Sequence, residues 1–203
     1  MKETFFIESI KLLDGVYHNL ELHGRRMART MEAFFGGRPG FELGEALPGR
    51  VPQKGLYKVR VVYGQRVQSV EVLPYVMRAV KSLEVVEAGG MDYSYKYLDR
   101  RAIDGLKAKS RADDIIIAVD GFVSDSSAAN LVFEGEGGLF TPGRCLLAGV
   151  KRESLLAMGR IERADIRVGD LVKYKRVRLI NAMIDLEDNV SVAREAIAMN
   201  GPW

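Results

Sequence analysis

A lysine between two tyrosines is the first candidate for covalent chemistry. Lys96 lies in DYSYKYLDRRAIDGL, residues 92–106, directly before an expected helix. An amine attacks a carbonyl carbon only in its neutral form, so burial or a neighbouring cation would have to lower the lysine pKa from about 10.4. Most lysines remain solvated. A chemical role for Lys96 therefore depends on residues elsewhere in the chain.

Other reactive side chains are few. One cysteine, Cys145, and two histidines leave neither an internal disulfide framework nor a Cys/His cluster for structural zinc. Cys145 is interpreted as a small apolar filler. His23 shares an expected helix with Arg26, and it is interpreted as a packed, hydrogen-bonded histidine because no acidic or nucleophilic partner is placed with it.

The composition is that of a soluble globular protein. Of 203 residues, 47% are hydrophobic and 28% charged, which fits one large or two small domains. The net charge of +3 is spread along the chain, without the dense basic run of nucleic-acid or membrane-surface proteins. The start, MKETFFIESIKLLDG, resembles neither a secretory signal nor a membrane span. We expect a cytoplasmic protein without nucleic-acid or membrane partners.

Periodicity predicts a small α/β lobe over residues 1–78. The Asp14-Gly15 pair indicates a hairpin, because both residues tolerate positive φ. Apolar spacing predicts a helix from about Glu21 to Phe35, which the following glycines end. Alternating residues on both sides of Gly64 predict a second hairpin.

A larger, β-rich lobe is expected over residues 79–203, starting with the segment of Lys96 and a polar helix. Short strands punctuated by Asp120-Gly121 and by glycines 135–138 should follow. VKRESLLAMGR is predicted as a helix whose amino end can hold an anion. LVKYKRVRLINAMIDLED should supply a strand or strand pair, and SVAREAIAMN a last helix. The fold class is therefore α+β.

Five segments, in this order, resemble the fold-type IV pyridoxal-phosphate enzymes, the class IV aminotransferase family, and most closely its 4-amino-4-deoxychorismate lyase branch. They are FIESIKLLDG, LELHGRRM, YKYLDR, DGFVSDSSAANLVF followed by LFTPGRCLLAGVKR, and INAMI. The resemblance covers nearly the whole chain. It implies a two-lobe fold like that of D-amino-acid aminotransferase, pyridoxal 5'-phosphate as cofactor, and a homodimer. Relative to the family the chain begins almost at FIESIK, so a first lobe shortened at its start is expected.

The resemblance also assigns cofactor contacts. Lys96 matches the lysine that forms a Schiff base with the cofactor aldehyde. Asp125, in SDSSAANL, stands where the family has a glutamate paired with the pyridine nitrogen. Aspartate is one methylene shorter, so it would sit closer to the ring, act through water or fail to pair; a solvated turn aspartate is the alternative. Arg26, in HGRRM, matches the arginine that binds the phosphate through its fork of donors.

Further positions carry over from the remaining segments. Gly149 and Val150 match the helix amino end that completes the phosphate site. Asn181 and Ala182 resemble residues beside the cofactor and the substrate carboxylate. Asn130 is expected to fix its own loop by hydrogen bonds. These assignments rest on the resemblance alone.

Substrate contacts are the least specific part of the resemblance. Ser9 stands where the lyase branch has a hydroxyl residue near the substrate, although a plain strand serine is the alternative. Arg60 and Tyr63 are candidates to meet a substrate carboxylate. The family's cation near this strand end is absent, because the sequence reads VVYG.

Three functions remain open on these grounds. The first is an aminodeoxychorismate lyase that eliminates pyruvate from an amino substrate to give 4-aminobenzoate for folate synthesis. The second is an amino-acid aminotransferase, of the branched-chain or D-amino-acid type, with the same machinery. The third is a protein that holds the cofactor without turnover, which Asp125 and the short start would favour.

Overall fold

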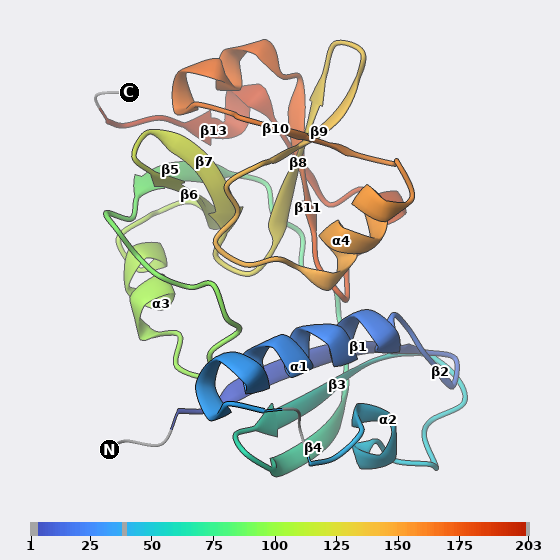
Figure 1. The fold of residues 1–203 in the computed structure, drawn as a ribbon. Helices are drawn as coiled ribbons and strands as arrows, with labels where there is room; N and C mark the ends of the chain where they lie inside the picture. Colours follow the sequence, from blue (N-terminus) through green and yellow to red (C-terminus); the bar gives the residue numbers. More distant parts are fainter. Residues whose placement is uncertain (1–3, 38–39, 202–203) are drawn as a thin grey trace. The chain divides into compact units, whose positions relative to one another are not determined.

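The computed structural model describes residues 4–37 and 40–201. The chain divides into two compact units (Figure 1). The first extends to Met77 and includes Tyr95–Asp99; the second contains Arg78–Ser94 and the chain from Arg100 onward. No helix among the described residues is long and apolar enough to cross a membrane.

The first unit is built on an antiparallel sheet with strand order β2-β1-β3-β4. Its strands are β1 Phe6–Leu13, β2 Val16–Tyr17, β3 Leu56–Tyr63 and β4 Val67–Pro74. Asp14 and Gly15 have φ of 47° and 81°, the left-handed pair that a two-residue hairpin requires. Both predicted hairpins are therefore confirmed.

Helix α1, Leu20–Phe35, covers one face of this sheet (Figure 1). It ends at Gly36, whose φ of 69° is the left-handed conformation that closes many helices. Its buried Met27 and Met31 pack against alternate residues of β1 and β3. The predicted helix is confirmed; a single turn, α2 Leu43–Ala46, also joins this core.

The second unit contains a nine-stranded mixed sheet with the order β10-β9-β8-β7-β6-β5-β13, while β11 pairs with β8 and β12. Its elements are β5 Leu83–Glu87, α3 Arg101–Lys107, β6 Asp114–Val119, β7 Phe122–Ser126, β8 Asn130–Gly135, β9 Gly138–Pro142, α4 Val150–Ala157, β10 Glu162–Ala164, η1 Val168–Lys173, β11 Arg176–Ile180, η2 Leu186–Asp188, β12 Ser191–Ala193, η3 Arg194–Ala196 and β13 Ile197–Ala198. The predicted run of strands after residue 113 and the helix before residue 158 are confirmed.

Two expectations are wrong. SVAREAIAMN is not a helix: Val192 pairs with β11 and Ile197 with β5, and both are buried. Tertiary pairing here overrides a helical spacing of apolar residues. The segment of Lys96, expected in the second lobe directly before a helix, packs with the first unit, and α3 begins only at Arg101.

Candidate functional site

The two tyrosines beside Lys96 fix its backbone. The rings of Tyr95 and Tyr97 pack with Phe34 at centroid distances of 4.8 and 5.9 Å, and Tyr97 lies 5.3 Å from Phe6. The Tyr97 N–H also donates to the Tyr95 carbonyl at 2.9 Å, which closes a tight turn centred on Lys96. The aromatic cluster therefore holds both neighbours of the half-buried Lys96.

Backbone hydrogen bonds add the Lys96 segment to the start of β1. The Ile7 N–H donates to the Lys96 carbonyl at 2.9 Å, and the Leu98 N–H donates to the Phe5 carbonyl at 2.9 Å. Phe6 and Tyr97 form an antiparallel bridge between them. The lysine is thus held next to the strand that carries Glu8.

A fully buried carboxylate, Glu8, binds two residues of α1. Arg26 donates from Nε to Oε1 at 2.9 Å and from Nη2 to Oε2 at 2.5 Å, and His23 Nδ1 lies 2.6 Å from Oε2. Burial alone would raise the pKa of Glu8. The charge of Arg26 and the hydrogen bonds from both partners outweigh it, so the pKa falls to about 2.

His23 is neutral at physiological pH. Burial lowers its pKa, and the charges of Arg26 and Lys96 act in the same direction against the opposing effect of Glu8. Because Glu8 is ionised, the proton of neutral His23 belongs on Nδ1. Within the described ranges no residue hydrogen-bonds to its buried Nε2. The expectation that His23 has no acidic partner is wrong.

Arg26 lies on the buried side of α1, whereas Arg25 is 66% exposed and pairs with Glu21 at 3.6 Å. Two of the three guanidinium nitrogens of Arg26 face Glu8. The carboxylate fixes the plane of the guanidinium and also offsets its charge.

The predicted substrate residues divide between the two faces of the sheet. Ser9 is directly opposite Arg60 across the β1–β3 ladder, so both lie on the face away from α1. Tyr63 pairs with Phe6 on the α1 face, where it is fully buried. Burial, followed by the Glu8 charge, raises its pKa. The structure brings Ser9 and Arg60 together and separates Tyr63 from them; Arg60 also pairs with Glu71 at 2.9 Å.

In the second unit, Asp125 is a buried carboxylate bound on both oxygens. Asn130 Nδ2 donates to Oδ1 at 2.7 Å, and the Leu147 N–H donates to Oδ2 at 2.8 Å. Burial raises the pKa of Asp125 to about 6, against these hydrogen bonds and the charge of Arg152. The solvated-turn alternative is wrong, because Asp125 is only 5% exposed.

Gly149 is the residue before α4, and Val150 is its first residue. The helix has no side-chain cap, so its first N–H groups are available for an anion. Asn130 also donates to the Leu147 carbonyl at 2.9 Å, which ties this turn to β8. Asp125, Asn130 and Gly149 therefore form one cluster.

Asn181 connects a turn to the same cluster. Its Oδ1 accepts from the N–H groups of Met183 and Ile184 at 2.9 and 3.1 Å, and its Nδ2 donates to the Ala128 carbonyl at 3.1 Å. The side chain thus joins the turn at residues 181–184 to the loop between β7 and β8. Ala182 lies half-buried within that turn.

Glu8 and Arg152 are among the buried charges that sequence reasoning missed. Arg152 donates to Thr141 Oγ1 at 3.2 Å and to the Pro142 carbonyl at 2.8 Å, and it is 2% exposed. A signal for Glu8 existed, because its position in the period-two pattern of β1 places it on the same face as apolar residues. No comparable signal marked Arg152, whose helix also carries half-buried charges.

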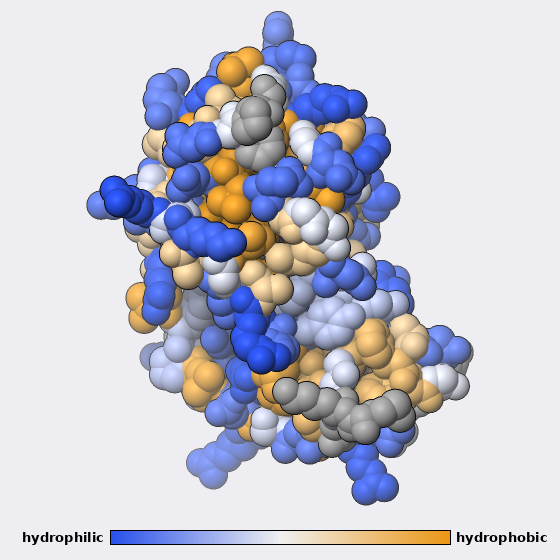
Figure 2. All heavy atoms as spheres, turned by 90° about the vertical axis from the view of Figure 1, so that its left-hand side faces the viewer, coloured by the Kyte–Doolittle hydropathy of each residue, from blue (hydrophilic) through white to orange (hydrophobic). Residues whose placement is uncertain are grey.

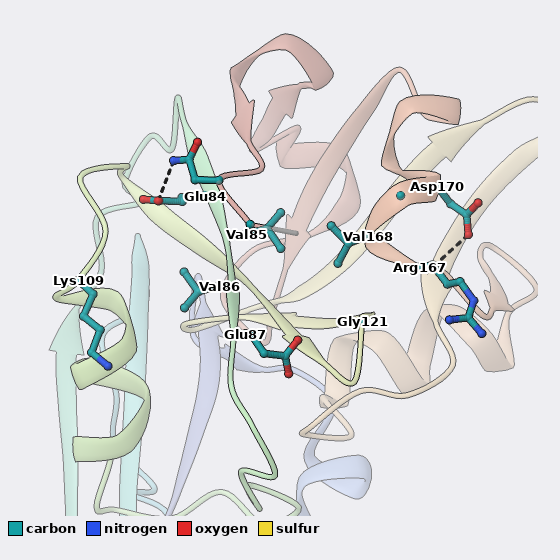
Figure 3. Close-up of a pocket in the computed structure, with 12 residues that line it drawn as sticks. Glu84, Val85, Val86, Glu87, Lys109, Gly121, Arg167, Val168 and Asp170 are labelled. Atoms are coloured by element: carbon teal, nitrogen blue, oxygen red, sulfur yellow. Dashed lines mark hydrogen bonds between the residues drawn. The ribbon is translucent and has the colours of Figure 1, made fainter. Parts of the chain in front are cut away.

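The second unit also has a groove of about 730 Å³ between β5 and η1 (Figure 3). Val85, Val86 and Val168 form its apolar part, with Glu87 and Arg167 beside them. None of the predicted site residues lines it. The face drawn in Figure 2 is mainly hydrophilic, with an apolar patch in the upper part of the view. The groove is distinct from the cluster of Asp125.

Comparison with known proteins decides the family. Residues 94–186 match the model described as amino-transferase class IV. An uncharacterized protein of Haemophilus influenzae is 31% identical over 180 residues, which cover 87% of this chain and 96% of that one. The chain belongs to the class IV aminotransferase family.

Solved structures of similar proteins agree. A "putative 4-amino-4-deoxychorismate lyase" from Haemophilus somnus is 28% identical with a TM-score of 0.85, over 92% of this chain and all of that one. A "hypothetical aminotransferase" from Mycobacterium tuberculosis in a PLP-bound form is 17% identical with a TM-score of 0.78, over 98% of this chain and 82% of that one, and shares the fold. The expected α+β, fold-type IV class is confirmed.

This class IV aminotransferase family member is an enzyme, so the hypothesis of a protein without turnover is set aside. The family depends on pyridoxal phosphate. The residues of this chain fit that cofactor in two respects. Asp125 is a carboxyl group whose pKa is raised to about 6 by burial, and the amino end of α4 presents N–H donors without a side-chain cap.

Proposed function

We propose that the protein is a pyridoxal-phosphate-dependent aminodeoxychorismate lyase, which releases pyruvate and 4-aminobenzoate for folate synthesis in the cytoplasm. The observation that carries this proposal is the 28% identity, over 92% of this chain and all of the other, to the Haemophilus somnus protein named a putative lyase. The bound cofactor would supply an electron sink for negative charge on a substrate carbon.

Each candidate residue then has a defined task. Lys96 would attach the cofactor and afterwards move a proton between substrate carbons through Nζ. Asp125 would accept a hydrogen bond from the protonated pyridine nitrogen. Gly149 and Val150 would offer backbone N–H groups to the phosphate, and Arg26 would contribute the charge of its guanidinium. Asn181 would act mainly by holding the Ala182 turn in place, since its amide already binds backbone groups.

Substrate selection is proposed to involve the face of the first sheet away from α1. Ser9 and Arg60 are cross-strand neighbours there, and Arg60 remains 31% exposed beside Glu71. A guanidinium suits a substrate carboxylate. Tyr63 is proposed to support β3 from the opposite face rather than to touch substrate, because it is fully buried.

The alternative is an amino-acid aminotransferase with the same cofactor residues. Incubation with aminodeoxychorismate should release 4-aminobenzoate and pyruvate in equal amounts. Incubation with 2-oxoglutarate and a panel of L- and D-amino acids should give no glutamate above the background of Lys96→Ala. Transfer of the amino group without release of 4-aminobenzoate would replace the lyase by the aminotransferase.

A further inference from the structure

Asn130, the first residue of β8, makes side-chain hydrogen bonds to two other segments of the second unit. Its two amide hydrogens are both used, one on Asp125 Oδ1 at 2.7 Å and one on the Leu147 carbonyl at 2.9 Å. Asp125 in turn accepts from the Leu147 N–H at 2.8 Å. One asparagine therefore links the buried carboxylate to the peptide that leads into α4.

The amide oxygen of Asn130 explains why residue 149 is glycine. A Cβ at that position would lie 1.9 Å from Asn130 Oδ1, and the three nearest atoms all belong to Asn130. The backbone itself does not need glycine, because φ of −72° and ψ of 140° suit any residue. The requirement is steric and comes from one side chain.

We propose that Asn130 is a positioning residue, which sets the carboxylate of Asp125 and the amino end of α4 at a fixed spacing. This inference rests on the proposed function in one respect: that Asp125 and α4 hold the two ends of pyridoxal phosphate. The mechanical link itself does not depend on the cofactor.

A double-mutant cycle on the protein without cofactor tests the link. Gly149→Ala should lower the melting temperature by several degrees, because its Cβ collides with Asn130. In an Asn130→Ala background the same substitution should not lower the melting temperature further, because the atom that collides with the new Cβ is absent. An equal decrease in melting temperature on Gly149→Ala in both backgrounds would overturn the proposed link. Asn200→Ala, which removes only an exposed hydrogen bond to Glu84, is the matched control and should leave the melting temperature unchanged.

Cofactor measurements test the positioning role. Asn130→Asp keeps the shape but replaces both donors and adds a negative charge beside Asp125. The pH midpoint of the absorbance change of bound pyridoxal phosphate should move upward, and the affinity should fall about tenfold. The other charged or titratable groups acting near Asp125, Arg152 and Cys145, are the same in all variants.

The outcomes separate the two claims. An unchanged midpoint and affinity in Asn130→Asp would overturn the positioning role. If the unmodified protein binds no pyridoxal phosphate, the proposed function fails; the melting cycle then still decides whether Asn130 fixes the turn before α4.

Discussion

Glu8 is a fully buried carboxylate that binds both Arg26 and His23. Burial of a charge is tolerated only with compensation, and here a guanidinium and an imidazole N–H provide it. The arrangement fixes Arg26 and the tautomer of His23 together. Loss of Glu8 should therefore affect the fold before it affects chemistry.

Glu8→Gln should lower the free energy of unfolding by about 3–5 kcal/mol, because Arg26 would remain buried without its anion. Glu71→Gln is the matched control: Glu71 also pairs with an arginine at 2.9 Å but is 47% exposed, so its loss should cost at most about 1 kcal/mol. Urea denaturation of both variants at pH 7 measures the difference. Equal decreases in the free energy of unfolding of the two variants would contradict a stabilising role for the buried network.

The same carboxylate should make stability depend on acid pH. Its folded pKa of about 2 lies below the unfolded value of 4.5, so its stabilising effect is complete above pH 4.5 and is lost as the pH falls toward 2. The gap corresponds to about 3 kcal/mol. Urea unfolding between pH 5 and 2.5 should show this loss in the unmodified protein and a smaller one in Glu8→Gln. If the free energy of unfolding fell equally with pH in both proteins, Glu8 would not be the source of the acid dependence.

Residues within short motifs could be predicted from the sequence, whereas their partners across the fold could not. The family resemblance of SDSSAANL identifies Asp125, and its pairing with Asn130 follows from the tight β7–β8 turn. Glu8 meets His23 and Arg26 only because α1 packs on β1. Tyr63 and Arg60 were grouped by proximity in sequence, but strand alternation places them on opposite faces.

Elements with strong local signals were also predictable. The Asp14-Gly15 turn, α1 and the strands from β6 to β9 each carry their own turn residues or apolar period. The apolar spacing after residue 190 indicates a helix, but the buried residues there pair with β11 and β5 instead. The structure of this element is therefore determined by residues that are distant in sequence.

The strands at the end of the chain can be tested by one pair of substitutions. Val192→Ala, in β12 and 1% exposed, should cost about 2 kcal/mol through lost burial and a cavity. Val172→Ala, 63% exposed in η1, should change stability by less than about 0.5 kcal/mol. Chemical denaturation monitored by circular dichroism compares them. A neutral Val192→Ala would contradict the packing of β12.

At the scale of the whole molecule, we propose a homodimer, as the family resemblance implies. Light scattering should then give a mass of twice the 22.6 kDa chain at micromolar concentration. The mass should not change when salt is raised, if the interface is mainly apolar. A mass of one chain at all concentrations would contradict the dimer.

The central claim is that Lys96 carries pyridoxal phosphate, and borohydride reduction followed by peptide mapping tests it most directly. The protein incubated with pyridoxal phosphate should absorb near the visible edge, and reduction should fix the cofactor on the peptide that contains Lys96. Lys96→Ala should fold normally and retain no fixed cofactor. A colourless protein, or cofactor fixed on another lysine, would contradict the account.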